Sequence, residues 1–235
     1  MPPLRRVTVL PEHDPGSWYW SVPAVAQLRE QGLDLRAGVT VLVGANGSGK
    51  STLVEALAAA WSRRLTANVH HWAPEVADED ADLGRWLWLD GEHPPPQGGC
   101  FLRAEAMHAH FGGLEHHARA FDGVPLNARS HGEGFLAFLE SRRTERGLYL
   151  LDEPEAALSF RSCLALLVLL GDAVAAGSQV VLATHSPLLA AMPGARVLEL
   201  GEHGMEPRDW AELDLVRDWR EFLAAPDRWL RHLTG

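Results

Sequence analysis

Residues 44–52 combine glycines, one lysine and hydroxyl side chains in an order suited to binding phosphate groups. The segment matches the pattern G-x-x-x-x-G-K-[ST] and consists of Gly44, Ala45, Asn46, Gly47, Ser48, Gly49, Lys50, Ser51 and Thr52. Glycines let successive backbone N–H groups curve around a phosphate at the start of a helix, where the helix dipole favours negative charge. Lys50 would reach the β- and γ-phosphates, and the Ser51 hydroxyl would bind Mg²⁺. The segment therefore predicts a site for Mg-ATP, whereas its alternative reading is a glycine turn that caps a helix.

The use of cationic residues supports the same interpretation. Lys50 is the only lysine among the 21 Lys and Arg residues of the chain. An ammonium group is a compact point charge, whereas a guanidinium group is a planar fork, so the two are not interchangeable where space is restricted. The composition indicates that position 50 requires the compact ion.

An acidic pair, Asp152 and Glu153, follows the apolar segment Leu148–Leu151. A carboxylate in this position can hold Mg²⁺, and the next one can orient or deprotonate an attacking water molecule. An acidic pair after an apolar strand also occurs as a solvated turn. Together with the phosphate-binding segment, the pair predicts a hydrolytic site with Ser51 and Asp152 as metal ligands.

The elements that must position these residues alternate between strands and helices. Apolar strands are predicted at Val39–Val43, Leu148–Leu151, Val180–Ala183 and Val197–Leu200, with a further strand at Cys100–Arg103. Leu53, Leu57 and Trp61 mark one face of the helix after residue 49, and Arg161–Ala176 is a helix that can connect two parallel strands. We expect one α/β domain, residues 1–235, with a mostly parallel sheet flanked by helices.

Other segments are predicted from composition and pattern. Residues 73–99 are irregular and read as a surface insertion, part of a longer segment, 73–130, that also holds an abbreviated helical region. Residues 210–233 read as two short amphipathic helices broken at Pro226. Their large apolar residues are expected to pack in the core rather than to form a binding surface; these are Trp219, Phe222, Trp229 and Leu230.

The order of these motifs resembles that of the ABC-type ATPases, and in particular of compact, stand-alone ATPases of this type. Residues 152–158 resemble the run from Walker B to the D-loop, and the Thr-His-Ser sequence at 184–186 falls where the family has its switch histidine. The resemblance covers roughly residues 39–200 and implies a P-loop NTPase fold. It also implies that Glu153, Lys50 and His185 are catalytic, with His185 at the γ-phosphate.

The segment Ser130-His131-Gly132-Glu133-Gly134 resembles the family's signature motif, in the Ser-x-Gly-Glu form of chromosome-maintenance and recombination ATPases. The alternative reading is a cap for a helix at residues 135–142. The resemblance implies that two protomers enclose two ATP molecules, with Ser130 and Gly132 reaching across the interface, and that hydrolysis separates them. The ATP-driven homodimer is thus the leading interpretation.

The chain also departs from the family pattern. His131 replaces the usual first glycine of the signature, and Ser159 stands where transporters usually have Asp, so communication between subunits is expected to differ. Gln97 precedes the strand at residues 100–103, which leaves Glu105 as the substitute for the Q-loop glutamine. The aromatic residue that stacks on adenine would come from residues 18–20, where edge packing is the alternative: Trp18, Tyr19 and Trp20.

Bulk properties restrict the remaining function classes. A net charge of −10 argues against a large nonspecific nucleic-acid surface. No apolar run reaches the roughly 20 residues that span a bilayer, and no signal peptide is evident, so the protein is expected to be cytoplasmic with reduced Cys100 and Cys163. Open alternatives are a nonhydrolysing ATP-gated module, a transporter subunit and a DNA-repair component; a protein or nucleic-acid partner is expected but not identified.

Overall fold

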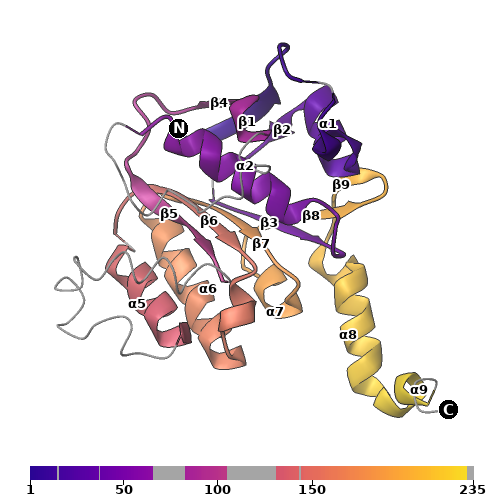
Figure 1. The fold of residues 1–235 in the computed structure, drawn as a ribbon. Coiled ribbons are helices and arrows are strands. Elements are labelled where there is room, and N and C mark those ends of the chain that lie inside the picture. The colour runs from indigo at the N-terminus through magenta and orange to yellow at the C-terminus, as the bar shows by residue number, and fades with distance from the viewer. Residues whose placement is uncertain (15, 37, 66–82, 105–130, 143, 232–235) are drawn as a thin grey trace.

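The computed structural model describes residues 1–14, 16–36, 38–65, 83–104, 131–142 and 144–231. Two sheets form the framework (Figure 1). A six-stranded sheet has the order β5-β6-β7-β3-β8-β9, and a three-stranded sheet has the order β2-β1-β4. The six strands, in spatial order, are Gly98–Arg103, Gly147–Asp152, Gln179–Ala183, Gly38–Gly44, Arg196–Gly201 and Gly204–Pro207. The three strands, in spatial order, are Leu33–Asp34, Leu4–Val9 and Leu87–Gly91.

The larger sheet confirms the predicted α/β class. Strands β5, β6, β7, β3 and β8 run parallel, and only β9 is antiparallel to its neighbour. Strands β6 and β7 are buried at every position, which is expected for parallel strands covered on both faces. Because parallel strands end at the same edge, the segments that follow β3, β6 and β7 come together there.

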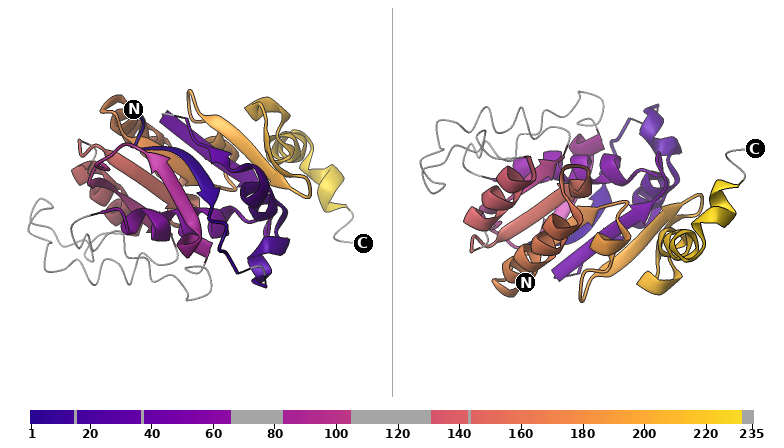
Figure 2. Two further views of the ribbon diagram at one scale, coloured as in Figure 1. Left: turned by 90° about the horizontal axis from the view of Figure 1, so that it is seen from above. Right: turned by 90° about the horizontal axis from the view of Figure 1, so that it is seen from below.

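Helices cover the two faces of the larger sheet in separate layers (Figure 2). On one face, α2 (Lys50–Ser62) lies between the two sheets, and α1 (Pro23–Gln31) packs beside it after the short helix η1 (Trp18–Ser21). On the other face lie α5 (His131–Arg142), α6 (Phe160–Ala175) and α7 (Pro187–Ala190). Leu53, Leu57 and Trp61 are buried on α2 as predicted, and both cysteines are buried free thiols.

The prediction of a surface insertion at residues 73–99 is wrong for the second half of that segment. Residues 66–82 lie outside the described part of the chain, but β4 pairs with β1 in the antiparallel sheet. Leu87 and Leu89 are buried, whereas Trp88 between them is 62% exposed. This two-residue alternation is typical of a strand with one covered face, so the signal was present in the sequence.

Two helices extend away from the sheet at the C-terminal side of the described residues, α8 (Asp214–Ala224) and α9 (Pro226–Leu230), after the short helix η5 (Trp210–Glu212). We call α8 and α9 the C-terminal arm. The predicted break at Pro226 is confirmed, but the predicted core packing is wrong for Trp219, Trp229 and Leu230, which are 46%, 44% and 44% exposed. Only the first turn of α8 reaches the core, through Val216, and Phe222 is partly buried. Helical periodicity identifies an apolar face but not what covers it.

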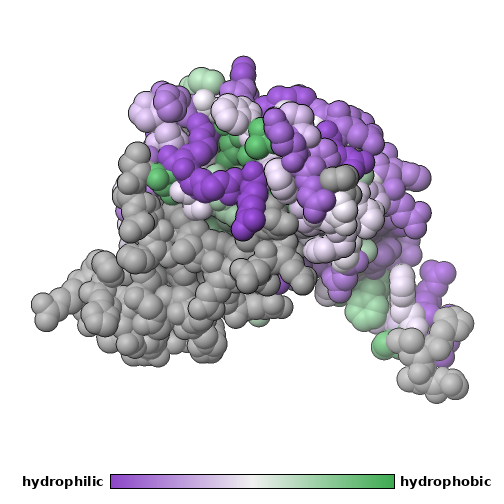
Figure 3. All heavy atoms as spheres, turned by 45° about the horizontal axis from the view of Figure 1, so that its top comes forward, coloured by the Kyte–Doolittle hydropathy of each residue, from purple (hydrophilic) through white to green (hydrophobic). Residues whose placement is uncertain are grey.

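Apolar residues reach the surface along the C-terminal arm beside charged ones (Figure 3). Among the described helices, none combines the length and the apolar character needed to cross a membrane.

Candidate functional site

The phosphate-binding segment forms a tight loop between the end of β3 and the start of α2. Gly44, Gly47 and Gly49 have positive φ angles of 150°, 78° and 97°. A Cβ atom on Gly44 would lie 2.4 Å from the backbone oxygen of Leu200 in β8, and one on Gly49 would lie 2.7 Å from a methyl group of Val22. Backbone conformation therefore favours glycine at all three positions, and Gly44 and Gly49 also lie too close to their neighbours for a side chain, whereas Gly47 has open space around it.

Lys50 lies inside this loop. Its Nζ atom donates hydrogen bonds to the carbonyl oxygens of Gly44 and Ala45, each at 3.1 Å, and the residue is only 3% exposed. Burial lowers the pKa of the Lys50 ammonium group from its usual value, while the Glu153 and Asp152 carboxylates act in the opposite direction. The ammonium group is thus held at the centre of the loop, where the sequence analysis expects phosphates.

Ser51 and Asp152 meet across the gap between α2 and β6. The Ser51 hydroxyl donates to Asp152 Oδ1 at 3.1 Å, and Asp152 is 1% exposed. Burial raises the pKa of the Asp152 carboxyl to about 6, opposed by the Ser51 hydrogen bond and by Arg103, whose Nε lies 3.7 Å from Oδ2. A hydroxyl and a poorly solvated carboxylate are oxygen ligands of the kind that Mg²⁺ prefers, so the residues present fit this ion.

Glu153 begins the turn after β6 in an unusual backbone conformation. Its φ angle is 47°, which makes it the one non-glycine residue with positive φ in the described part of the chain. Its N–H donates to the Ala183 carbonyl of β7 at 3.0 Å, which ties the turn to the neighbouring strand. Such strain persists only where the surroundings impose it, and it clusters at functional sites.

His185 faces Glu153 from the end of β7. Its Nε2 atom lies 3.2 Å from Glu153 Oε1, which is close enough for an ion pair, although the alignment is not that of a hydrogen bond. Both side chains are about one third exposed, at 32% for His185 and 38% for Glu153. Two predicted site residues from different strands are therefore brought together.

The remaining predicted residues have different outcomes. Ser130 and Glu105 lie outside the described residues. Gly132 is in the first turn of α5, where an added Cβ would lie 3.0 Å from the Ala157 carbonyl, so the start of this helix closely approaches the turn after Glu153. Gln97 donates to Pro95 and precedes β5, as the sequence analysis stated. The contribution of Gly132 to a second protomer remains a prediction.

The three aromatic residues of η1 differ in how much of each side chain is exposed to solvent. Tyr19 and Trp20 are 1% and 6% exposed and belong to the core, whereas Trp18 is 51% exposed. The packing alternative therefore applies to Tyr19 and Trp20. Stacking of an exposed Trp18 on adenine stays a prediction.

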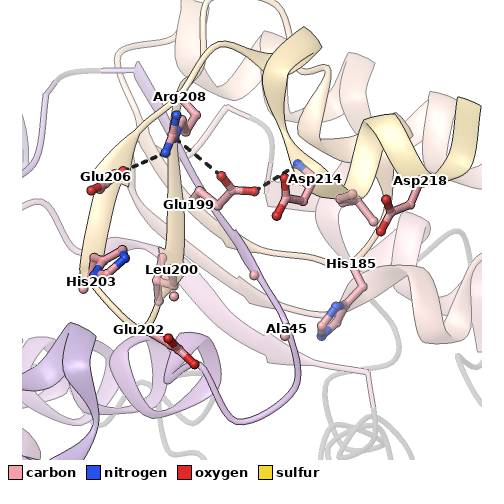
Figure 4. Close-up of a pocket in the computed structure, with 14 residues that line it drawn as sticks. Ala45, His185, Glu199, Leu200, Glu202, His203, Glu206, Arg208, Asp214 and Asp218 are labelled. Carbon is pink, nitrogen blue, oxygen red and sulfur yellow. Dashed lines mark hydrogen bonds and ion pairs between the residues drawn. The ribbon is translucent and has the colours of Figure 1, made fainter.

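A cavity of about 520 Å³ lies beside the phosphate loop and includes Ala45 and His185 in its lining (Figure 4). Its other wall is formed by β8, β9 and the start of α8. Glu199 accepts a hydrogen bond from the Asp214 N–H at 3.2 Å and lies 3.6 Å from Arg208. No local sequence pattern identifies this wall, because its residues become neighbours only through the β8–β9 hairpin.

Glu155 is a second feature that the sequence analysis did not identify. Its Oε1 atom accepts hydrogen bonds from the Thr184 hydroxyl at 2.8 Å and from the His185 N–H at 2.5 Å. The residue belongs to the short helix η4 (Pro154–Ala157), directly after Glu153. Glu155 lies within residues 152–158, which resemble the run from Walker B to the D-loop, but only the fold brings it to the end of β7.

Comparison with known families gives two matches along the chain. A family model described as "AAA domain" matches residues 23–68, which contain the phosphate loop. A model described as "AAA domain, putative AbiEii toxin, Type IV TA system" matches residues 120–191, which contain Asp152, Glu153 and His185. The two matches therefore cover the segments that carry the site.

Several curated proteins are similar to most of the chain. The cytochrome c biogenesis ATP-binding export protein CcmA of Paramagnetospirillum magneticum is 35% identical over 73% of the chain and 85% of that protein. The hemin import ATP-binding protein HmuV of Streptomyces coelicolor is 34% identical over 70% of the chain and 66% of that protein. The pyoverdine export ATP-binding/permease protein PvdT of Pseudomonas fluorescens is 32% identical over 82% of the chain, which spans only 32% of that protein.

The fold is also found among solved structures. A structure titled "An inward-facing conformation of a putative metal-chelate type ABC transporter" matches with a TM-score of 0.51. The match covers 89% of this chain and 84% of the other, at 18% identity. At that identity the likeness concerns the fold alone.

Proposed function

Because the chain belongs to the ABC-type P-loop ATPases, a family of ATP hydrolases, we propose that it is an ATP-driven dimerisation switch. Two protomers enclose two Mg-ATP molecules, and each adds Ser130 and Gly132 to the site of the other. Hydrolysis removes the γ-phosphate that joins the two surfaces, and the protomers separate.

Each residue has a separate part in the proposed reaction. The loop from Gly44 to Thr52 and Lys50 bind the phosphates, and Ser51 and Asp152 hold Mg²⁺. Bound Mg²⁺ supplies Lewis-acid stabilisation of charge on the phosphate oxygens. Glu153 accepts a proton from the attacking water, and His185 contacts the γ-phosphate.

One observation supports the hydrolytic part of this proposal: side chains from three separate segments meet at one edge of the larger sheet. Lys50 and Ser51 come after β3 at the start of α2. Asp152 ends β6 and Glu153 follows it, and His185 comes after β7. The contacts of Ser51 with Asp152 and of Glu153 with His185, at 3.1 and 3.2 Å, join these segments. A metal-binding pair and a base beside a histidine support ATP hydrolysis rather than ATP binding alone.

A second candidate function is that of an ATP-binding subunit of a transporter. It is favoured by the printed functions of CcmA and HmuV, which are ATP-binding proteins for export and import. In that case the dimer would also need a membrane partner. Turnover of the purified chain that requires no added membrane component would favour the stand-alone switch.

The dimerisation switch is tested with Glu153→Gln, which keeps the shape of the side chain but removes the base. The variant should bind Mg-ATP and accumulate as a dimer, as measured by light scattering with and without the nucleotide. Glu221→Gln, an exposed change on α8, should behave like the parent protein. Ser130→Arg in the Glu153→Gln chain should restore the monomer, because the arginine would block the neighbouring γ-phosphate site.

One result would contradict the homodimeric switch. If Glu153→Gln binds Mg-ATP at saturation and stays monomeric, the chain is not a homodimeric switch. The nonhydrolysing ATP-gated module, with a site that a partner protein completes, would then be the better account.

A further inference from the structure

Glu155 connects the turn after Glu153 to the end of β7. One carboxylate oxygen, Oε1, accepts two hydrogen bonds, from the Thr184 hydroxyl at 2.8 Å and from the His185 backbone N–H at 2.5 Å. These bonds reach 29 and 30 residues along the chain, so they join two elements that the backbone does not connect locally. The first of the two partners, Thr184, is fully buried.

Thr184 extends this contact into a short network. Its hydroxyl oxygen accepts the Ser186 N–H at 2.9 Å while its proton is directed to Glu155. The backbone N–H of Thr184 donates to Leu42 of β3 at 3.0 Å. The backbone on both sides of His185 is therefore fixed by hydrogen bonds, and linked bonds of this kind strengthen one another in a buried environment.

The two oxygens of the Glu155 carboxylate differ in their surroundings. Oε2 of Glu155 is buried and has no hydrogen-bond partner among the described residues. Leaving a buried polar atom unpaired is costly, and more so for a charged group. An apolar side chain would avoid this cost but would leave the His185 N–H and the Thr184 hydroxyl without their acceptor.

We propose that Glu155 is a positioning residue for ATP hydrolysis, which holds His185 against Glu153 and so sets the geometry at the γ-phosphate. The inference rests on the proposed role of His185 in the function above. Glu155 follows Glu153 in the same turn, so its two hydrogen bonds hold the backbone of His185 beside the segment that carries the proposed base. The side chains of His185 and Glu153 approach to 3.2 Å in this arrangement. Its contact is with the backbone of His185, and it acts on the reaction only through that residue.

The first test separates nucleotide binding from turnover. Glu155→Ala should keep the Mg-ATP affinity within about twofold, because Lys50, Ser51 and Asp152 are unchanged, and should slow single-turnover hydrolysis by about 10- to 100-fold. A misplacement of about 1 Å at a reacting group costs about 10²-fold, which sets the upper value. Glu221→Ala, an exposed glutamate on α8, is the matched control and should hydrolyse ATP at the parent rate.

The second test distinguishes positioning from a general effect of charge or folding. Glu155→Gln keeps an oxygen that can accept both hydrogen bonds, so it should restore most of the rate lost in Glu155→Ala. Thr184→Val removes one of the two donors and should give an intermediate rate. If Glu155→Ala does not fold, the Gln and Val variants still decide the matter: a Gln variant that lacks turnover, or a Val variant at the parent rate, would overturn the proposal.

A double-mutant cycle tests whether Glu155 acts through His185. In the His185→Ala background, adding Glu155→Ala should cause no further loss of rate. Multiplied losses would show independent action and would overturn the positioning role. If His185→Ala is slow and Glu155→Ala is at the parent rate, only this inference fails. If His185→Ala itself is at the parent rate, the proposed role of His185 fails as well.

Discussion

The nucleotide-binding edge of the larger sheet and the C-terminal arm differ in how their characteristic side chains are placed. At the edge, charged groups that ordinarily prefer water are buried and paired: Lys50 is 3% exposed and Asp152 1% exposed, each within hydrogen-bond distance of a defined partner. In the arm, large apolar groups that ordinarily avoid water are exposed, including Leu223 at 69%. Charged side chains are thus buried at the edge and apolar side chains are exposed in the arm, which is the opposite of where each kind usually lies.

The two regions differ in whether contacts within the chain compensate for the unfavourable placement of these side chains. The edge fixes its buried charges with its own backbone and side chains, as expected where binding groups must be held before the ligand arrives. The described residues contain no comparable cover for the exposed apolar groups of the arm. The edge therefore pairs Lys50 and Asp152 by its own contacts, whereas the arm beyond Val216 leaves its large apolar side chains exposed.

The largest expected effect is the loss of nucleotide binding when the buried cation at the edge is removed. Lys50→Ala should abolish Mg-ATP binding measured by calorimetry, because it removes the charge placed inside the loop. Lys50→Arg should also impair binding, since the loop is built around a compact ammonium group. Arg228→Ala, which removes an exposed cation from the arm, is the control and should bind normally. Unchanged affinity in Lys50→Ala would mean that the loop is not the phosphate site.

A pair of identical substitutions compares the core under the edge with the arm. Leu57→Ala on α2, at a site 1% exposed, should lower the free energy of unfolding by about 2–5 kcal/mol. Leu223→Ala on α8, at a site 69% exposed, should change it by no more than about 0.5 kcal/mol. Chemical denaturation measures both. A comparable loss in the Leu223 variant would show that the arm is covered in solution.

The smallest expected effect concerns the contribution of Asp152 to Mg²⁺ binding at the edge. Asp152→Asn should lose the increase in ATP affinity that Mg²⁺ provides, by about tenfold, because an amide is a weaker ligand than a carboxylate and a charge-assisted contact is worth about 1.5–3 kcal/mol. Affinity for ATP without Mg²⁺ should be unchanged or higher. Titrations with and without EDTA measure the two quantities. An Asn variant that retains the full Mg²⁺ effect would remove Asp152 from the metal site.

Sequence reasoning succeeded where chemistry restricts residue choice. The strands β3, β6 and β7 and the contacts between Ser51 and Asp152 were predictable because a glycine loop and carboxylates after apolar strands have few other uses together. The positive φ of Glu153 and the role of Glu155 as a hydrogen-bond acceptor were not predictable. They depend on how the turn after β6 meets β7, which no local pattern encodes.

The failures have a common physical cause. β4 was read as a surface insertion because its partner β1 lies far away in the sequence, so the burial of Leu87 arises only from tertiary pairing. Trp219 was assigned to the core because the amphipathic period of α8 marks an apolar face without saying whether the helix lies on the sheet. For α8 the apolar face was recognised and its lack of cover was not, whereas for β4 the alternation itself was missed.

The most direct measurement for the central claim compares Mg-ATP affinity and phosphate release in one preparation of Glu153→Gln. The account predicts an affinity close to that of the parent, because Lys50, Ser51 and Asp152 remain. It predicts release slower by about 10²-fold or more, the usual contribution of a positioned base. Release at the parent rate with normal affinity would contradict it, since Glu153 could not then be the group that acts on the attacking water.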